Sequence, residues 1–210
     1  MNFEDIQNMV ITGDAKGAES WTNKALEAGI SAKDIIDLGL IVGMDEVGRR
    51  FKVEEYYMPE VLISARAMTT SMNIVRPLIA SSDTTSRGSV VIGTVHGDLH
   101  DIGKNLVRMM FEGAGYEVRD LGVDVTAEAF VKAVEEKPTD LVCLSALLTT
   151  TMNSMSVIVK ALEEAELRTS TKVMVGGAPL SDAFAEKIGA DAYAPDAATA
   201  VETATKLISA

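Results

Sequence analysis

The feature that most constrains the fold is a regular alternation of short apolar runs and helical segments in the second part of the chain. From residue 89 onward, each apolar run is followed by a segment with helical periodicity, and glycine or proline separates many of them. The expected strands are 90–95, 117–121, 141–145, 172–175 and a weak one at 192–193. The expected helices are 104–112, 127–136, 152–166, 182–188 and 197–208.

This alternation predicts an α/β domain built on a parallel sheet. Strands that alternate with helices form such a sheet, with helices on both of its faces. Five units fit a flavodoxin-like (Rossmann-like) five-stranded parallel sheet better than a six-stranded dinucleotide-binding fold. Because parallel strands end at a common edge, the loops after strands one, three, four and five should meet there.

The first 80 residues predict helices instead of strands. A short opening helix near 3–10 precedes a helix that Asp14 caps. Ser31 begins a variant capping box for a longer helix, and Pro59 suits the first turn of the last helix. Two apolar stripes at helical spacing mark buried faces, namely Ile36, Leu40, Met44, Val47 and Phe51, and then Leu62, Ala65, Met68, Met72, Val75 and Ile79. We therefore expect an N-terminal four-helix bundle over 1–80.

A polar stretch separates the two regions. Residues 81–88 contain serine, threonine, aspartate, arginine and glycine but no large apolar side chain, and they show no periodicity. We expect 81–88 to be a linker between a helical-bundle cap domain, 1–80, and an α/β domain, 89–210.

Composition narrows the class of protein. Of the 210 residues, 47% are hydrophobic and 24% charged, as in a soluble globular protein. No apolar run approaches the ~20 residues that cross a bilayer, and the N-terminus does not resemble a signal peptide, so we expect a cytoplasmic location and no membrane partner. The single cysteine, Cys143, lies in an apolar run and is interpreted as a small buried side chain. A net charge of −12 argues against nucleic acid as a partner.

Residues with chemical function concentrate at the expected edge of the sheet. Both histidines, His96 and His100, follow the first strand. The loop after the third strand supplies hydroxyl groups, and the loop after the fourth begins with Gly176 and Gly177. This combination suits a large ligand with a polar tail.

The loop after the first strand resembles a known motif. The spacing Asp98-x-His100-x-x-Gly103 is similar to the cobalamin-binding motif of corrinoid proteins. Further matches follow in the order of that family: Gly97 to Asn105, then Ser145, Leu147 and Thr149, then Gly176 and Gly177, and in the N-terminal half Gly43 to Phe51 and Met58 to Leu62. The chain thus resembles the corrinoid proteins of methanol, methylamine and O-demethylase methyltransferase systems, and the cobalamin-binding module of methionine synthase.

The resemblance implies a role for three residues in catalysis. His100 would be the lower axial ligand of the cobalt in cobalamin. Asp98 would accept a hydrogen bond from the other ring nitrogen, which fixes the tautomer and raises the basicity of the ligand. Thr151 stands where the family has a hydroxyl that extends this relay, although methionine synthase usually has serine there, which leaves the part of Thr151 open.

The resemblance also implies a set of cofactor contacts. The dimethylbenzimidazole tail of cobalamin would leave the cobalt and enter the α/β domain, while two residues of the cap would cover the methyl-bearing face of the corrin. The residues implied are Gly97, Asp98, Leu99, His100, Asp101, Ile102 and Gly103 in the motif loop, Ser145, Leu147, Thr149 and Thr150 after the third strand, Gly176, Gly177, Ala178 and Ala194 near the tail, and Phe51 and Met58 in the cap.

The function implied by the resemblance is that of a corrinoid methyl carrier. Cobalt(I) would accept a methyl group from a substrate-specific methyltransferase, and methyl-cobalt(III) would pass it to a second methyltransferase with a thiol or tetrahydrofolate acceptor. A reductive activator would be a third partner. A methyl-activating barrel takes about 250 residues, so this chain is expected to need its partner subunits for catalysis.

Three other interpretations remain open at this point. The motif also occurs in the cobalamin-binding subunit of carbon-skeleton mutases, which do not normally have the helical cap. A cobalamin-based sensor can have a similar cap, but it usually adds an output domain. A flavodoxin-like or receiver-like domain without cobalamin would account for the sheet but not for the ordered motifs. The methyl donor itself is not indicated by the sequence.

Overall fold

The chain forms two compact units. The computed structural model describes residues 1–78 and 86–209. One unit contains Met1–Ser86 with the short stretch Glu112–Gly115, and the other contains Arg87–Phe111 and Tyr116–Ala210. Most of the expected linker, 81–88, and the expected core residue Ile79 lie outside the described residues.

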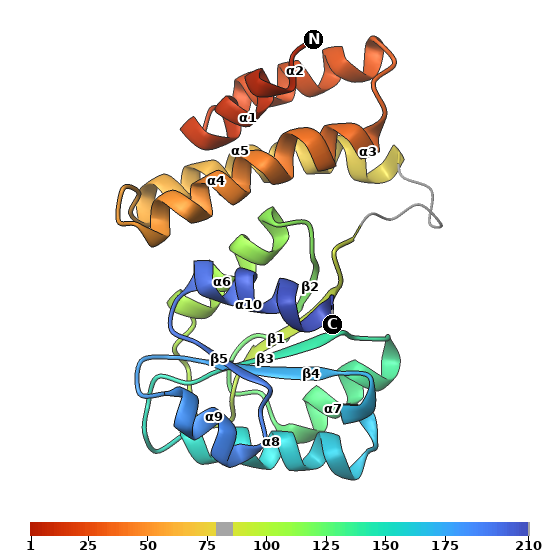
Figure 1. Cartoon of the computed structure of the whole chain (residues 1–210). Helices are drawn as coiled ribbons and strands as arrows, with labels where there is room; N and C mark the ends of the chain where they lie inside the picture. Colours follow the sequence, from red (N-terminus) through yellow and green to blue (C-terminus); the bar gives the residue numbers. More distant parts are fainter. Residues whose placement is uncertain (79–85, 210) are drawn as a thin grey trace. The chain divides into compact units, whose positions relative to one another are not determined.

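The first unit is helical, as predicted. Its N-caps are Asn2, Asp14 and Ser31, whose side chains accept hydrogen bonds from backbone N–H groups in the first turns. The helices are α1 (Phe3–Thr12), α2 (Ala15–Glu27), α3 (Ala32–Asp34), the π-helical η1 (Ile35–Leu40), α4 (Ile41–Lys52), α5 (Met58–Val75) and the 3₁₀ turn η2 (Arg76–Leu78) (Figure 1).

The helix that starts after Ser31 contains a π-helical segment that the sequence pattern did not predict. η1 lies between α3 and α4, and the Gln7 side chain donates a hydrogen bond of 2.7 Å to the carbonyl of Leu38 within it. The backbone of α4, directly after η1, approaches α1 closely, because a Cβ on Gly43 would lie 2.9 Å from the Gln7 carbonyl oxygen. The expected stripe on this helix is nevertheless buried from Ile36 to Val47.

The buried face of α5 differs in part from the predicted one. Ala65, Met68 and Val75 are buried as expected, but Leu62 is exposed. Its place is taken by Val61 and by small polar residues. Among these, Ser71 accepts a buried hydrogen bond of 2.9 Å from the Thr22 hydroxyl on α2. The apolar periodicity did not identify these positions, because serine has no hydrophobic signal.

The second unit contains a five-stranded parallel sheet in the order β2-β1-β3-β4-β5, which confirms the flavodoxin-like prediction. The pattern located every strand to within one residue at either end. In β1, β3 and β4 the signal is a nearly continuous apolar run, because these strands are buried on both faces. The strands are β1 (Ser89–Thr94), β2 (Glu117–Asp120), β3 (Leu141–Ser145), β4 (Lys172–Gly176) and β5 (Ala192–Ala194).

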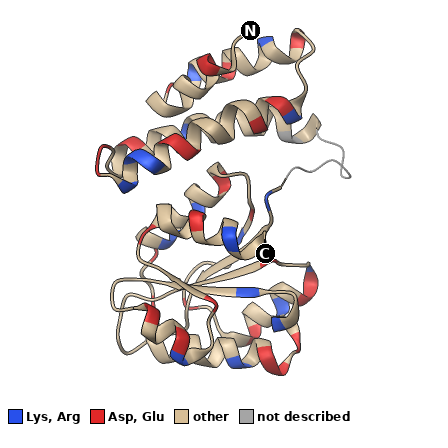
Figure 2. Cartoon of the chain, viewed as in Figure 1, with Lys and Arg blue, Asp and Glu red and all other residues tan. Residues whose placement is uncertain are grey.

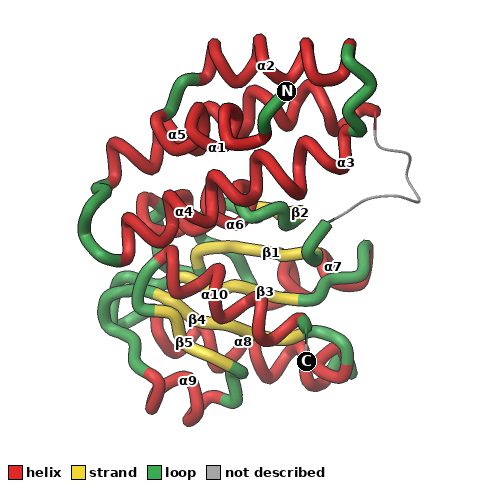
Figure 3. The backbone as a smooth tube through the Cα atoms, turned by 45° about the horizontal axis from the view of Figure 1, so that its top comes forward, coloured by secondary structure: helices red, strands yellow, loops and turns green. Residues whose placement is uncertain are grey.

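Helices cover both faces of this sheet. Figures 1 and 3 show α6 and α10 on one face and α7, α8 and α9 on the other. Between the second group and the sheet lies a core that includes Phe130, Met155 and Leu162. The helices are α6 (Ile102–Gly113), α7 (Ala127–Glu136), α8 (Met152–Glu164), the 3₁₀ turn η3 (Leu167–Thr169), α9 (Asp182–Ile188) and α10 (Ala197–Ile208).

Cys143 lies in the middle of β3 and is buried, as the sequence indicated. Burial raises the pKa of its thiol well above the usual value, because the thiolate would lose its hydration. The charged residues lie mostly on helices and loops (Figure 2). In the described part of the chain, none of the helices combines the length and the apolar character that crossing a membrane requires.

A cluster at the end of α4 predicts a pH-dependent contribution to stability. Glu46 accepts hydrogen bonds of 2.7 Å from Arg49 Nε and 2.8 Å from Arg50 Nε, which lower its pKa to about 2. Its pKa is thus depressed by folding, so the cluster stabilises the protein above pH 4.5 and loses this effect as the pH falls towards 2. We expect Glu46→Gln to reduce the free energy of unfolding at pH 7 by less than about 1 kcal/mol, since water screens exposed ion pairs.

Urea unfolding of the whole chain, followed by circular dichroism at pH 7, 4 and 2, measures this effect. Glu27→Gln, at an exposed position of α2, controls for the loss of one negative charge. The difference between Glu46→Gln and the unmodified chain should disappear near pH 2. A difference that persists there would contradict the assignment.

Candidate functional site

The ends of four strands form one row across the carboxyl edge of the sheet. Thr94 of β1 is paired with Ser145 of β3, Ser145 with Gly176 of β4, and Gly176 with Ala194 of β5. The loops that the sequence predicted to meet therefore start side by side. This register brings the predicted residues of four separate segments to one place.

Asp98 is the buried centre of the loop after β1. Its side chain is fully buried, and its two oxygens face different loops. Oδ1 accepts a hydrogen bond from the His100 N–H (3.1 Å) and lies 2.7 Å from His100 Nδ1. Oδ2 accepts hydrogen bonds from the N–H groups of Leu147 (2.8 Å) and Leu148 (3.2 Å), at the end of β3. Asp98 thus joins two of the strand-end loops.

These hydrogen bonds keep Asp98 ionised. Burial is the largest single influence on its pKa and raises it, because a carboxylate loses hydration inside a protein. The donors from Leu147, His100 and Thr151 together outweigh burial and hold the pKa of Asp98 well below its usual range. Asp98 is therefore a permanent hydrogen-bond acceptor at neutral pH.

Thr151 contacts Asp98, as the relay requires. Its side chain is buried, and its hydroxyl lies 2.8 Å from Asp98 Oδ2 and 2.9 Å from the carbonyl oxygen of Leu148. A hydroxyl has one hydrogen, so it donates to one of these two acceptors at a time. Thr151 precedes α8, and the sequence alone could not show that it reaches across to the loop after β1.

His100 presents one ring nitrogen to the outside. Because Asp98 is ionised, it accepts a hydrogen bond, and this assigns the ring hydrogen to Nδ1. In the neutral ring the lone pair is then on Nε2, and 49% of the side chain is exposed. A neutral imidazole held by a carboxylate in this way is the arrangement that proteins use for metal-ligating histidines.

Large apolar side chains are exposed in two segments, the one that contains Asp98 and His100 and the one that follows β3. Leu99 and Ile102 come from the loop after β1 and the first turn of α6, and Leu147 and Leu148 follow β3. Leu147 and Leu148 also donate their N–H groups to Asp98, so the apolar residues and the carboxylate belong to one construction. A cluster of exposed large apolar residues is typical of a ligand or protein contact.

Two glycines of the predicted site, Gly177 and Gly103, differ in whether the fold itself requires a glycine there. A Cβ on Gly177 would lie 1.9 Å from the Ala146 carbonyl oxygen, and its φ of 137° favours glycine, so the packing of the chain itself requires it. The family resemblance implied only that this glycine lies near the nucleotide tail. A Cβ on Gly103, in the first turn of α6, would meet no described heavy atom within 4 Å.

The remaining predicted residues lie in several environments. Asp101 accepts a hydrogen bond of 2.9 Å from the Asn105 side chain at the start of α6. In the second unit, Thr149, Thr150 and Ala178 are exposed, Ser145 is half-buried, and Ala194 is buried. In the first unit, Phe51 near the end of α4 and Met58 at the start of α5 are both half-buried.

A second carboxylate that the sequence analysis did not single out also supports the loop after β1. Asp124 Oδ1 accepts a hydrogen bond of 2.7 Å from the Gly97 N–H and lies 2.7 Å from His96 Nδ1. The Gly97 hydrogen bond is the main influence that lowers the pKa of Asp124. The sequence does not distinguish Asp124 from other loop carboxylates, because Gly97 is 27 residues away and the two meet only in the folded chain.

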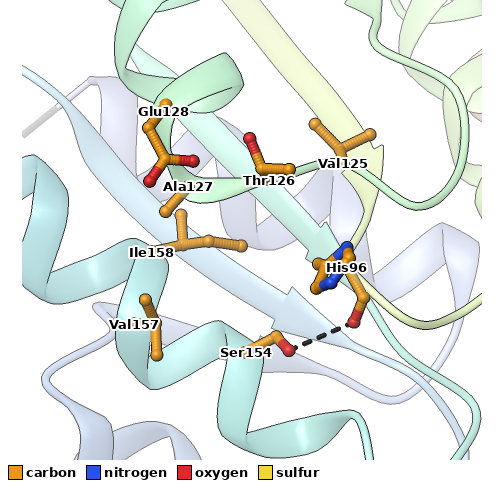
Figure 4. Close-up of a pocket in the computed structure, with 8 residues that line it drawn as sticks. All are labelled: His96, Val125, Thr126, Ala127, Glu128, Ser154, Val157 and Ile158. Atoms are coloured by element: carbon orange, nitrogen blue, oxygen red, sulfur yellow. Dashed lines mark hydrogen bonds between the residues drawn. The ribbon is translucent and has the colours of Figure 1, made fainter.

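His96 also lines a pocket of about 330 Å³ (Figure 4). The pocket lies between the start of α7, with Thr126 and Glu128, and α8, with Ser154 and Val157. The Ser154 hydroxyl donates a hydrogen bond of 3.1 Å to the His96 carbonyl oxygen. His96 thus contacts Asp124 and Ser154 and takes no part in the His100–Asp98 pair.

Lys104 is a further residue whose role the sequence did not show. Its ammonium group is buried and donates hydrogen bonds to Asp120 Oδ1 (2.6 Å) and to the Gly122 carbonyl oxygen (3.3 Å). Lys104 therefore attaches the first turns of α6 to the end of β2. Its position in the motif region has a structural explanation.

Comparison with known proteins identifies the family of this chain. A family model described as the B12 binding domain matches residues 88–204, and a second model with that description matches residues 3–76. The chain is 41% identical over 209 residues to a corrinoid protein of Desulfitobacterium hafniense, with 98% of this chain and 97% of the relative covered. It is 44% identical over 190 residues to the trimethylamine corrinoid protein of Methanosarcina barkeri, with 90% and 88% covered.

A solved structure agrees over the full length. The methanol:cobalamin methyltransferase complex of Methanosarcina barkeri contains a chain that matches with a TM-score of 0.89 and 30% identity, covering 99% of this chain and 79% of that one. Sequence and structure therefore agree on both the helical part and the α/β part. The chain belongs to the family of corrinoid proteins that contain B12-binding domains.

Proposed function

We propose that this chain is the corrinoid methyl-carrier subunit of a multi-component methyltransferase. The observation that supports this most directly is the His100–Asp98 pair, in which a buried carboxylate holds one ring nitrogen of a side chain that is 49% exposed. The relatives named for trimethylamine and for methanol support a methyl-transfer system. We further propose that the protein acts in the cytoplasm and that it needs partner subunits for catalysis.

The residues present fit a bound cobalamin. His100 would supply the axial nitrogen to cobalt, and the exposed side chains of Leu99, Ile102, Leu147 and Leu148 would contact the corrin. The open space at Gly103 fits as well, because an external ligand explains a glycine that the chain does not require. Around the strand ends, Ser145, Thr149, Thr150, Gly176, Gly177, Ala178 and Ala194 would hold the nucleotide tail, and Gly97 and Asp101 would shape the motif loop.

Each protein group then has a separate task. Cobalamin, when bound, supplies a cobalt centre that accepts and donates a methyl group. Asp98 would hold the His100 hydrogen at Nδ1, so that Nε2 carries the lone pair when the ring is neutral. Thr151 supports the position of Asp98 by hydrogen bonding to its second oxygen. The helical unit, residues 1–80, would act as a cap, in which Phe51 and Met58 exclude water from the methyl-bearing face.

The proposed partners follow from the role of a carrier. A substrate-specific methyltransferase would load the methyl group, a second methyltransferase would move it to a thiol or to tetrahydrofolate, and a reductive activator would restore inactive cofactor. The names of the relatives make methylamines and methanol the first donors to test. Methyl transfer from each donor, in the presence of its purified methyltransferase and the cobalamin-loaded chain, tests this part of the proposal.

The first prediction from this proposed function concerns His100. The chain, labelled with ¹⁵N-histidine and loaded with cobalamin, should show histidine nitrogen coupling in the paramagnetic resonance spectrum of the cobalt(II) form. His100→Ala should abolish this coupling, because alanine has no lone pair to donate, while part of the cobalamin binding remains. His96→Ala is the matched control, since His96 belongs to the same loop but faces Asp124, and it should keep the coupling.

Two results would contradict this proposal. Failure of the unmodified chain to bind cobalamin would refute the carrier function. Coupling that survives His100→Ala, or that is lost in His96→Ala, would refute the choice of ligand.

The second prediction separates ligand contact from folding at Gly103. In the cofactor-free chain, Gly103→Ala should raise the free energy of unfolding by a few tenths to about 1 kcal/mol, because alanine favours a helix and has space there. The same change should weaken cobalamin binding, because the added methyl group would occupy space that the corrin needs. Asn73→Ala, at an exposed position in α5, should stabilise the chain without this loss.

Thermal unfolding and a cobalamin titration followed by fluorescence quenching or absorbance measure the two effects. If Gly103→Ala binds cobalamin as tightly as the unmodified chain does, the corrin does not lie against α6.

A further inference from the structure

We propose that Thr94 is a positioning residue for His100, because its hydroxyl fixes the main chain from which the imidazole projects. This inference rests on the proposed function, in which His100 binds the cofactor. The juxtaposition is specific: Thr94 Oγ1 donates a hydrogen bond of 2.9 Å to the carbonyl oxygen of His100, six residues further along the chain.

His100 needs such support because no regular structure holds it. It lies between the end of β1 and the start of α6, outside both elements. Its N–H donates to Asp98 Oδ1 at 3.1 Å, and its ring Nδ1 lies 2.7 Å from the same oxygen. With the Thr94 contact on its carbonyl group, three of its four polar atoms are held by two side chains. The fourth atom, Nε2, is the proposed ligand.

Thr94 is itself a rigid anchor. It is fully buried, it is the last residue of β1, and it is paired with Ser145 of β3. Its own N–H donates to the Gly122 carbonyl oxygen at 3.0 Å, and its carbonyl oxygen accepts from the Val125 N–H at 3.0 Å. A β-branched side chain has few rotamers, so the hydroxyl has a defined direction. The sheet thereby determines where the His100 carbonyl group lies.

The two supports act on different parts of His100. Asp98 sets the ring and the N–H side, whereas Thr94 sets the carbonyl side and with it the peptide group that leads into α6. Without the Thr94 hydroxyl, that peptide group gains freedom to rotate, and coordination would then have to order it. We therefore expect the ratio of coordinated to uncoordinated His100 to fall roughly 2- to 10-fold, the range expected for the loss of one hydrogen bond.

Three variants of the full-length chain test this role. Thr94→Val removes the hydroxyl at nearly constant volume, and Thr94→Ser keeps it. Thr171→Val is the matched control, because Thr171 is also buried and also donates its hydroxyl to a backbone carbonyl, that of Thr139, at 2.8 Å. Thr171 directly precedes β4, at the opposite end of the strands.

The main measurement is the fraction of cobalamin-loaded protein that shows ¹⁵N-histidine coupling in the paramagnetic resonance spectrum of the cobalt(II) form. The dissociation constant of cobalamin and the thermal unfolding temperature are recorded beside it. Thr94→Val should lower the coordinated fraction, and Thr94→Ser should restore it. Thr171→Val should lower the unfolding temperature and leave the coordinated fraction unchanged. If the role of Thr94 were merely structural, Thr94→Val would behave in the same way.

The outcomes separate this inference from the proposed function. If the unmodified chain lacks histidine coupling, the proposed ligand is refuted. If the unmodified chain has it and Thr94→Val has the same coordinated fraction, the role of Thr94 is refuted. Should Thr94→Val not fold, comparison of Thr94→Ala with Thr94→Ser isolates the hydroxyl oxygen, and equal coordinated fractions would overturn the inference.

Discussion

The site depends on one buried charge, the carboxylate of Asp98. An ionised group without exposure costs several kcal/mol unless both of its oxygens are hydrogen-bonded. Here Oδ1 is satisfied by His100 and Oδ2 by the segment that follows β3, including Thr151. The two loops can reach one carboxylate because β1 and β3 are adjacent in the sheet. The strand order, with β3 beside β1, is therefore a condition for the geometry of His100.

Much of the fold could be predicted because its signals are local. Continuous apolar runs indicated β1, β3 and β4, and the caps at Asp14 and Ser31 indicated helix starts. The family resemblance also proposed Asp98 and His100 as a pair, and Asp98 Oδ1 lies 2.7 Å from His100 Nδ1. The N–H donors of Leu147 and Leu148 could not be predicted, because every residue except proline has an N–H. The π-helical segment was missed because the apolar pattern does not report the pitch of the backbone. The burial of Ser64 and Ser71 was missed because serine is polar and its buried hydroxyl finds a hydrogen-bond partner only in the folded chain.

The glycines of the motifs show that one sequence pattern can combine unrelated constraints. Gly177 is required by the Ala146 carbonyl group, which belongs to the fold, whereas the space beside Gly103 is not used by the described chain. From the sequence both appear as small residues in loops near a ligand. The distinction becomes visible only when a Cβ is placed on each backbone. The fold itself requires a glycine at position 177, whereas packing within the described chain does not explain the one at position 103.

The burial of Cys143 affects which nucleophiles a methyl carrier exposes. Thiolates are the strongest methyl acceptors among ordinary side chains, and the proposed pathway delivers the methyl group to an acceptor of this kind or to a folate. The single thiol of this sequence is enclosed in β3 and remains protonated, because burial raises its pKa. The chain therefore exposes no thiolate that could compete for the methyl group, and Cys143 is protected from methylation between encounters with the partners.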